Sequence, residues 1–228
     1  MRSVPSTIIS MHLATILVLS EAACYTVYMK TNYQLLTDEY IASLTHRPRL
    51  LLHSCCGPCS TYVLEYLTQH FDVTVLFYNP NIQPEAEYEK RLYWQKQVLA
   101  RMGLAEKVPL IADEWRNADF RALTGGMENE PEGGSRCGIC IGLRLEETAR
   151  RASALGFELF CTTLSVSPHK NAQLINTLGE KLSAQYGVKW LPSDFKKRSG
   201  YLRSTQLCAE MGIYRQNYCG CTPQENML

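Results

Sequence analysis

Residues 49–60 read RLLLHSCCGPCS, an apolar run of strand length that ends in three cysteines and a glycine–proline pair. An apolar run followed by such chain breakers is typical of a buried strand. Residues 61–70 come next and form a predicted helix with Val63, Leu64 and Leu67 on one face. The segment is therefore a strand, a loop and a helix, which is the opening unit of an α/β fold.

The same alternation of strand-length and helix-length runs continues along the chain. Further strands are predicted at residues 73–78, 108–111, 158–162 and 188–191. Helices are predicted at residues 29–44, 84–102, 137–155, 171–186 and 201–211, with a short one within 117–135. This pattern predicts an α/β fold with a parallel sheet, helices on both faces and a Rossmann-like topology. Ligands of such sheets bind beyond the carboxyl ends of the strands, where the cysteine loop lies.

Length and composition narrow the class of protein. The 228 residues suit one domain, and a chain of this size buries enough surface to fold without disulfide staples. Hydrophobic residues make up 46% and charged residues 20% of the chain, which excludes a disordered protein. The net charge of +1 excludes a polyelectrolyte, so affinity for nucleic acid must come from a local patch.

One basic stretch could supply such a patch. Residues 189–215 hold six basic and two acidic side chains, a local net charge of +4, and tyrosines interleave with them. Aromatic rings can stack on unpaired bases, so the stretch is compatible with RNA contact. A solvated surface with anchoring tyrosines explains the same pattern. Further arginines lie in the predicted helix at 137–155, where glutamates partly offset their charge.

The ten cysteines are the most unusual feature of the composition. Seven of them fall in three tight clusters, C-C-x-x-C, C-x-x-C and C-x-C: Cys55, Cys56, Cys59, Cys137, Cys140, Cys219 and Cys221. Closely spaced thiols from three distant segments favour a metal or iron–sulfur site over disulfides, although redox-active thiols remain an alternative. A structural zinc site would need four of them and leave three unexplained. Cys161 and Cys208 stand alone in apolar stretches and are predicted core residues.

The loop after the first strand also resembles the phosphate-binding turn of ATP-using α/β enzymes. Such loops are rich in glycine and serine because their backbone amides cradle phosphate. The sequence SCCGPCS holds one glycine, its proline removes an amide, and thiolates there would repel phosphate. The sequence of this loop therefore favours metal binding over ATP binding.

The amino-terminal segment is predicted to lie outside the core. Residues 8–19 are mostly apolar and loosely fit a signal peptide, but they are too short to span a bilayer. We instead expect residues 1–28 to be a non-core extension, with Met29 as the working start and residues 29–228 as a single α/β domain. Exported thiol clusters would meet an oxidising compartment, so we expect a cytoplasmic protein without a membrane partner.

Six segments resemble one known family. They are HSCCGPCS, FYNPNIQPEAEYEKR, EGGSRCGICIGLRLEETA, TTLSVSPHKN, DFKKRSGYLRS and YRQNYCGC, and they lie within a match that covers about residues 29–221. In this order they resemble the cobalamin-independent epoxyqueuosine reductase QueH family. The resemblance implies a fold like that of the adenine nucleotide α-hydrolase (HUP) group. It also implies reduction of epoxyqueuosine to queuosine at the tRNA wobble position, by a 4Fe-4S cluster and a nearby mononuclear metal, iron or zinc.

The resemblance turns these residues into a candidate site. All seven clustered cysteines are expected to hold the two metal centres, with Cys59 standing where some family members have aspartate. The reaction removes an epoxide oxygen with two electrons and two protons, so a proton donor is required. The candidates for that role are His53, Asp194 and Tyr201. The expected partners are an unidentified electron donor and the tRNA that carries epoxyqueuosine in its anticodon loop, and the candidate tRNA contacts are Arg91, Lys170, Lys197 and Arg203.

Two other functions remain open on the residues alone. An iron–sulfur tRNA thiolation enzyme would share the fold and the thiols but would need an ATP loop. A zinc-stapled RNA-binding module without catalysis would use four thiols and the basic stretch.

Overall fold

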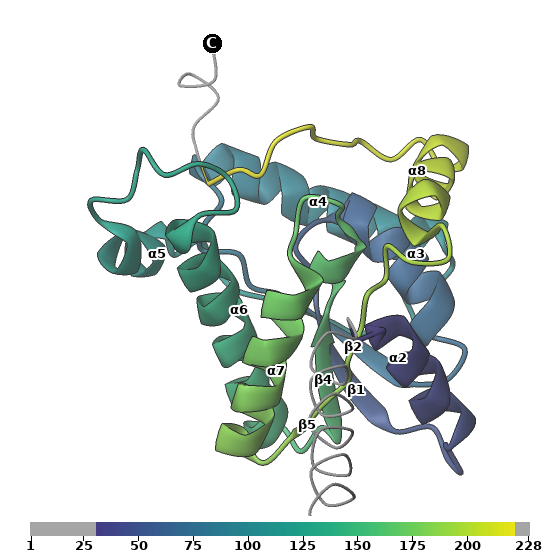
Figure 1. Cartoon of the computed structure of the whole chain (residues 1–228). Coiled ribbons are helices and arrows are strands. Elements are labelled where there is room, and N and C mark those ends of the chain that lie inside the picture. The colour runs from purple at the N-terminus through teal and green to yellow at the C-terminus, as the bar shows by residue number, and fades with distance from the viewer. Residues whose placement is uncertain (1–30, 222–228) are drawn as a thin grey trace, which may run out of the picture. The chain divides into compact units, whose positions relative to one another are not determined.

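The computed structural model describes residues 31–221, and its contacts divide the chain between Asn32 and Tyr33. The expectations for residues 1–28 lie outside the described residues. From Tyr33 onward the described chain forms an α/β fold around a five-stranded sheet, as the alternating pattern predicts (Figure 1). The finer likeness to the adenine nucleotide α-hydrolase group stays a prediction.

All neighbouring strands in the sheet are parallel. The strands are β1 (Arg49–His53), β2 (Asp72–Phe77), β3 (Leu110–Ala112), β4 (Leu159–Thr162) and β5 (Lys189–Trp190). Their order is β3-β2-β1-β4-β5, with Leu52 of β1 opposite Val75 of β2 on one side and Cys161 of β4 on the other. The central strands are buried on both faces, which is why β1 reads as an unbroken apolar run.

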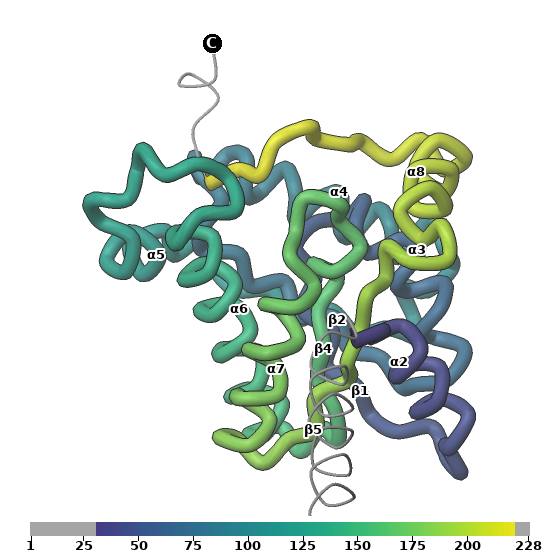
Figure 2. The backbone as a smooth tube through the Cα atoms, viewed as in Figure 1, coloured from purple at the N-terminus to yellow at the C-terminus, as the bar shows by residue number. Residues whose placement is uncertain are grey.

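Helices cover both faces of the sheet. They are α2 (Tyr33–Ala42), α3 (Gly57–Leu67), α4 (Glu85–Arg101), α5 (Asn117–Thr124), α6 (Ser135–Ala154), α7 (Ala172–Tyr186) and α8 (Gly200–Glu210), with a 3-10 turn η1 (Thr163–Val166). On one side α6 and α7 pack on each other and on the sheet, and on the other α3 packs against α4 and α8 (Figure 2). No helix among residues 31–221 is both long and apolar enough to cross a bilayer.

Most element boundaries agree with the predicted ones to within one or two residues. There are two exceptions. The helix predicted at residues 29–44 is α2, which begins only at Tyr33. The helix α3 begins at Gly57 rather than at residue 61, because Pro58 occupies its first turn, where a missing amide does no harm. The strand β3 also lies later than predicted, at Leu110–Ala112 instead of 108–111. The early start of α3 brings Cys59 into the helix itself.

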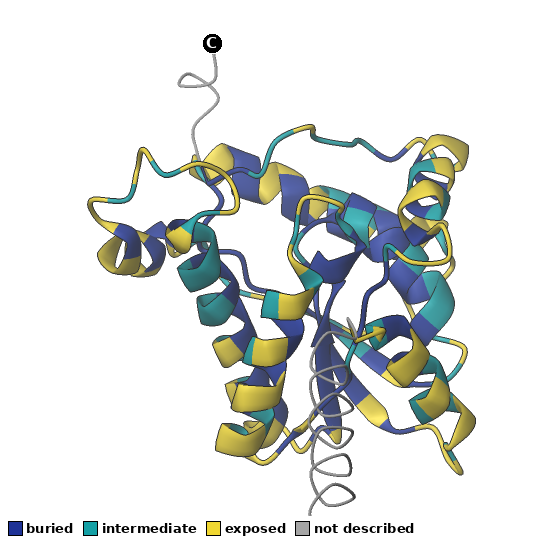
Figure 3. Cartoon of the chain, viewed as in Figure 1, coloured by how far each residue is buried: buried dark blue, intermediate teal, exposed yellow. Residues whose placement is uncertain are grey.

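The core lies between the sheet and its two helical layers, as the buried segments in Figure 3 show. Cys161 and Cys208 are both fully buried in it, which confirms their prediction as core residues. The strand order changes direction at β1, because β2 and β3 are added on one side of it and β4 and β5 on the other. Open α/β sheets bind ligands at this switch point, beyond the carboxyl ends of the strands.

Candidate metal centre

The first group of thiols, hereafter the triad, consists of Cys55, Cys56 and Cys59 at the carboxyl end of β1. Their three sulfur atoms lie within 4.8 Å of one another, and the Sγ atoms of Cys55 and Cys56 are 3.9 Å apart. A single tetrahedral ion with metal–sulfur bonds of 2.3 Å would hold its sulfurs about 3.8 Å apart. The triad is therefore spaced for one ion.

The start of α3 shapes the triad. Cys56 is the extended residue that precedes the helix, and Cys59 follows in its first turn. The partial positive charge of a helix amino terminus stabilises thiolates, the form that binds metal. The hydrogen bond from the Cys55 thiol is the main cause of a lowered pKa at Cys56, and the same contact raises the pKa of Cys55 to about 11.

Two contacts fix this segment against its surroundings. Across the switch point, the backbone amide of Cys55 donates to Thr163 Oγ1 (3.1 Å), and the Thr163 hydroxyl donates to Cys55 Sγ (3.4 Å). On the other side, a Cβ at Gly57 would lie 2.9 Å from the backbone oxygen of Trp94 in α4. The glycine thus permits the close approach of α3 and α4 that sets the triad in place.

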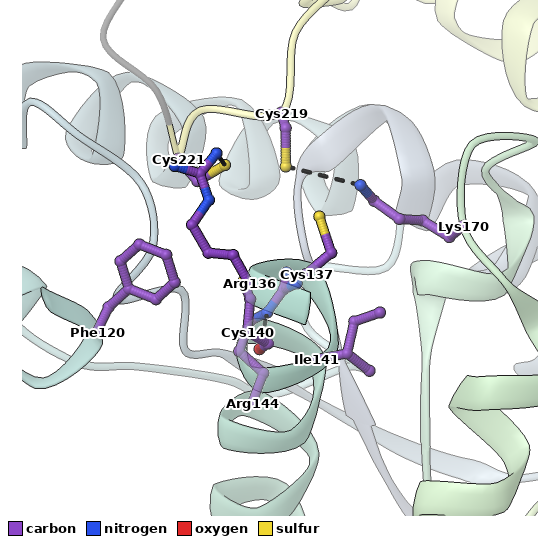
Figure 4. Close-up of a pocket in the computed structure, with 9 residues that line it drawn as sticks. All are labelled: Phe120, Arg136, Cys137, Cys140, Ile141, Arg144, Lys170, Cys219 and Cys221. Carbon is purple, nitrogen blue, oxygen red and sulfur yellow. Dashed lines mark hydrogen bonds between the residues drawn. The ribbon is translucent and has the colours of Figure 1, made fainter. Parts of the chain in front are cut away.

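The second group, hereafter the quartet, consists of Cys137, Cys140, Cys219 and Cys221. Cys137 and Cys140 stand one turn apart at the start of α6, and the other two come from the strap, residues 211–221, which follows α8. Figure 4 shows the four side chains gathering around one small cavity, with the Cys219 sulfur facing that of Cys137. Phe120 of α5 packs against Cys140 and Cys221 and closes one side.

Three cations line this small cavity, namely Arg136, Arg144 and Lys170, and among the described residues no carboxylate does. Lys170 Nζ lies 3.8 Å from Cys219 Sγ, and Arg136 Nη2 lies 3.6 Å from Cys221 Sγ. A hydrogen bond from Cys221, reinforced by Lys170 and Arg144, lowers the pKa of Cys219 to about 5. The surroundings therefore favour negative charge on Cys219, whereas burial raises the pKa of Cys140 and the hydrogen bond with Cys219 raises that of Cys221.

Contacts with the residues after β2 and with α4 hold the strap in place. Arg91 Nη1 donates to the carbonyl of Cys219 (2.8 Å), and its Nε pairs with Glu87 (2.6 Å). Gly220, with a φ of +93°, lies directly on the Arg91 guanidinium, where a Cβ would be 2.8 Å from Nη2. Gln83 adds two hydrogen bonds, from its backbone amide to Gly220 O (2.9 Å) and from its side chain to Cys221 O (2.7 Å).

The triad and the quartet border one larger cavity of about 350 Å³. Its lining includes all three triad cysteines, Cys219 of the quartet, and the side chains of Arg144 and Lys170, which also line the small cavity. A cavity of this volume is at the lower end of the range for small-molecule sites. The seven thiols that the sequence singles out thus line two cavities that share Cys219, Arg144 and Lys170.

The donor sets fit metal centres of two kinds. Four thiolates suit an iron–sulfur cluster or a zinc ion, and a cluster spreads its four sulfur ligands more widely than one ion does. Among the described residues, only the triad meets the close spacing of a single ion. The two groups therefore match a mononuclear site and a cluster site in adjacent positions.

The three candidate proton donors occupy different environments. His53 is fully buried, with Nδ1 2.8 Å from Thr162 Oγ1 and Nε2 3.1 Å from the Tyr78 carbonyl, and burial lowers its pKa to about 4. Both ring nitrogens are thus occupied within the sheet, and this geometry does not support the predicted catalytic role. Asp194 is paired with Lys196 at 2.6 Å. Tyr201 lines the large cavity and is 43% exposed.

The four candidate tRNA contacts also differ. Arg91 is 3% exposed and is engaged by Glu87 and the strap, so its geometry is that of an anchor. Lys170 lies beside Cys219 and pairs with Glu132 at 2.7 Å. Arg203 pairs with Glu65 and Glu210, whereas Lys197 is exposed and makes no ion pair with another described residue.

Sequence reasoning gave Arg144 no specific role, although the structure places it at both cavities. Its spacing was a usable signal, because Arg144 follows Cys137 by seven residues and Cys140 by four and so shares their helix face. The hydrogen bonds of Gln83 to the strap were not foreseeable, since they join segments far apart in the chain.

Comparison with known proteins identifies relatives of this chain. A family model described as "Epoxyqueuosine reductase QueH" matches residues 50–226. A Streptococcus pyogenes protein of that name is 47% identical over 177 residues, 77% of this chain and 69% of the relative. Its namesake from Staphylococcus epidermidis is 44% identical over 199 residues, 84% of each chain. The one from Thermotoga maritima is 39% identical over 175 residues, 75% of this chain and 88% of the relative.

Proposed function

Because the chain belongs to the epoxyqueuosine reductase QueH family, we propose that it is itself an epoxyqueuosine reductase, which converts epoxyqueuosine at the tRNA wobble position to queuosine. The observation that carries this proposal is that the seven thiols form two groups lining two cavities that share Cys219, Arg144 and Lys170. The reaction breaks both C–O bonds of the epoxide and leaves an alkene and water. It consumes two electrons and two protons.

We assign the two thiol groups to two centres. The quartet would hold the 4Fe-4S cluster, and the triad would hold a single iron or zinc ion. When bound, the cluster would supply electrons one at a time, and the ion would supply Lewis-acid chemistry toward the epoxide oxygen. The spacing of the triad, the wider quartet and the cations beside the quartet support this division.

The residues of the large cavity would bind and orient the modified nucleoside. A base that takes part in chemistry must leave its stack, and the cavity is large enough for the reacting part of such a nucleoside. Tyr201 presents a phenolic hydroxyl at the wall and is the best placed of the three candidate proton donors. Arg144 and Lys170 line the same cavity and would stabilise negative charge on the leaving oxygen.

The partners follow from this chemistry. The tRNA anticodon loop would approach the rim where α8 begins, since Tyr201 and Lys197 lie there. A separate electron donor must supply two electrons per turnover, because no residue of the chain is consumed. Free thiols in metal-binding groups require a reducing compartment, so we place the protein in the cytoplasm.

The test is an anaerobic turnover assay. The full chain is loaded with iron and sulfide and incubated with tRNA that contains epoxyqueuosine and with dithionite, and the nucleosides are then analysed. We expect queuosine from the wild type and from Cys161→Ala, which alters a core thiol, and none from Cys140→Ala. An iron-replete wild type that forms no queuosine would contradict the proposal. A colourless protein with one zinc would favour the RNA-binding module, and tight ATP binding would favour the thiolation enzyme.

A further inference from the structure

Arg144 has an unusual position between the two thiol groups. It extends from α6 and lines both the small cavity of the quartet and the large cavity that holds the triad. Its side chain is buried, with the residue 3% exposed. Its Nε donates to the carbonyl of Cys140 at 3.0 Å, and this contact fixes the guanidinium close to the quartet.

No carboxylate of residues 31–221 balances this charge. Arg91, which is equally buried, pairs with Glu87 at 2.6 Å, but Arg144 makes no ion pair with a described residue. A guanidinium does not lose its proton in proteins, and a buried charge needs a compensating one. The available negative charges are the thiolates on either side.

The positions of the sulfurs agree with this assignment. Arg144 lines the small cavity together with Cys140 and Cys219, and it lines the large cavity together with Cys55. Two of these sulfurs belong to the quartet and one to the triad. The charge of Arg144 therefore acts on both groups at once.

We propose that Arg144 is a positioning residue whose fixed positive charge raises the reduction potential of the centre held by the quartet. Adding one electron makes an iron–sulfur centre more negative by one charge, and a fixed nearby cation stabilises the reduced form more than the oxidised form. The same charge would offset repulsion between two anionic groups that face one cavity. This inference rests on the proposed cluster.

The experiment is an anaerobic redox titration of the iron-loaded full chain, followed by absorbance and electron paramagnetic resonance. We compare the wild type with Arg144→Met, which removes the charge, and with Arg144→Lys, which keeps it. The matched control is Arg150→Met, because Arg150 is on the same helix but is exposed and paired with Glu147.

At the wild-type midpoint, we expect the ratio of reduced to oxidised centre in Arg144→Met to be about tenfold lower. For a one-electron couple this is a downward shift of about 59 mV. Arg144→Lys and Arg150→Met should stay close to the wild type. If Arg144 had a purely structural role, the midpoint potentials of Arg144→Met and Arg144→Lys would not differ in this way.

The remaining outcomes of the titration also support or overturn the role proposed for Arg144. If Arg144→Met does not load iron, Arg144→Gln is titrated in its place, since it is also neutral but keeps a hydrogen-bond donor for the Cys140 carbonyl. An unchanged midpoint in a loaded neutral variant, or loss of iron from the neutral and lysine variants alike, overturns the inference. A wild type without a redox-active iron centre instead contradicts the proposed cofactor, and this is established before any variant is made.

Discussion

The triad and the quartet reach the same cavity by different routes. The triad comes from five consecutive residues at a junction of strand and helix, and the sheet, Thr163 and the packing of α3 on α4 fix its backbone. The quartet joins the start of α6 to the strap, and the strap depends on contacts with Arg91 and Gln83. The triad is therefore part of the core of the fold, whereas the quartet is completed by the strap.

This difference predicts different stabilities. Segments with few buried apolar contacts open at a lower free-energy cost than a central strand and its helix. The triad should therefore keep its geometry when the strap is disturbed, and the quartet should not. It also suggests why a strongly buried ion pair, Arg91 with Glu87, lies beneath the strap.

The largest expected effect comes from removing one thiol from each group. We expect Cys137→Ala to lose the iron–sulfur absorbance but to keep one tightly bound ion at the triad. Cys59→Ala should do the opposite. Each should lower turnover by more than the 10- to 100-fold that typically follows loss of an outer-shell partner of a metal ligand. Metal analysis and visible spectra measure both contents, and loss of both centres from either variant would contradict the division into triad and quartet.

The next effect in size is expected from Arg91→Ala. Removal of one partner from a buried pair leaves Glu87 uncompensated, which costs about 3–5 kcal/mol. The strap also loses the donors to its Cys219 and Tyr218 carbonyls, so cluster content should fall while the triad ion is retained. Denaturant unfolding and metal analysis test both parts.

Arg101→Ala is the matched control for Arg91→Ala. Arg101 also lies on α4 and donates to the carbonyls of Met211 and Gly212 at the beginning of the strap, but it is exposed and has no carboxylate partner among the described residues. Its loss should cost no more than about 1 kcal/mol and leave the cluster in place. Equal loss of cluster in the two variants would mean that the Arg91 pair is not the anchor of the strap.

A smaller effect is expected on the triad from Gly57→Ala. The added Cβ would meet the backbone oxygen of Trp94 at 2.9 Å, and such overpacking costs about 1–3 kcal/mol. Because the added methyl group would push α3 and α4 apart, metal binding at the triad should weaken, whereas metal binding at the quartet should not change. Gly142→Ala, on α6 with open space around its Cβ position, should be neutral or stabilising. Thermal unfolding of the two variants tests this prediction, and equal unfolding midpoints for Gly57→Ala and Gly142→Ala would contradict the close-packing argument.

The sequence predicts much of the fold because its strongest signals are local. The run at residues 49–53 agrees with β1 to the residue, since an unbroken apolar run between breakers leaves little choice. The start of α3 was missed because proline reads as a breaker, although it is well tolerated in a first helical turn. The close spacing of the cysteines is also a local signal, and it predicts which cysteines belong to the candidate metal site.

The division of the seven thiols could not be predicted, because it depends on which segments meet in space. No pattern in the neighbouring sequence indicates that Cys219 groups with Cys140 rather than with Cys55. The grouping depends on tertiary contacts such as those of Gln83 with the strap. Charges were the least predictable feature. Arg91 is a cation in a polar segment of the sequence, yet the fold buries it. Three of the six basic side chains at residues 189–215 pair with carboxylates, namely Lys196, Arg198 and Arg203.

The smallest effect is expected outside both thiol groups, at Lys197. This side chain is exposed on the rim beyond β5, and its charge is not neutralised by another described residue. Lys197→Ala should leave stability within about 0.5 kcal/mol and both metal contents unchanged. If Lys197 contacts a phosphate, its loss weakens tRNA binding modestly and reduces the slope of log affinity against log salt by about one. Lys107→Ala, before β3 at the opposite end of the sheet, is the matched control, and equal slopes for the two variants in a salt titration would place the tRNA elsewhere.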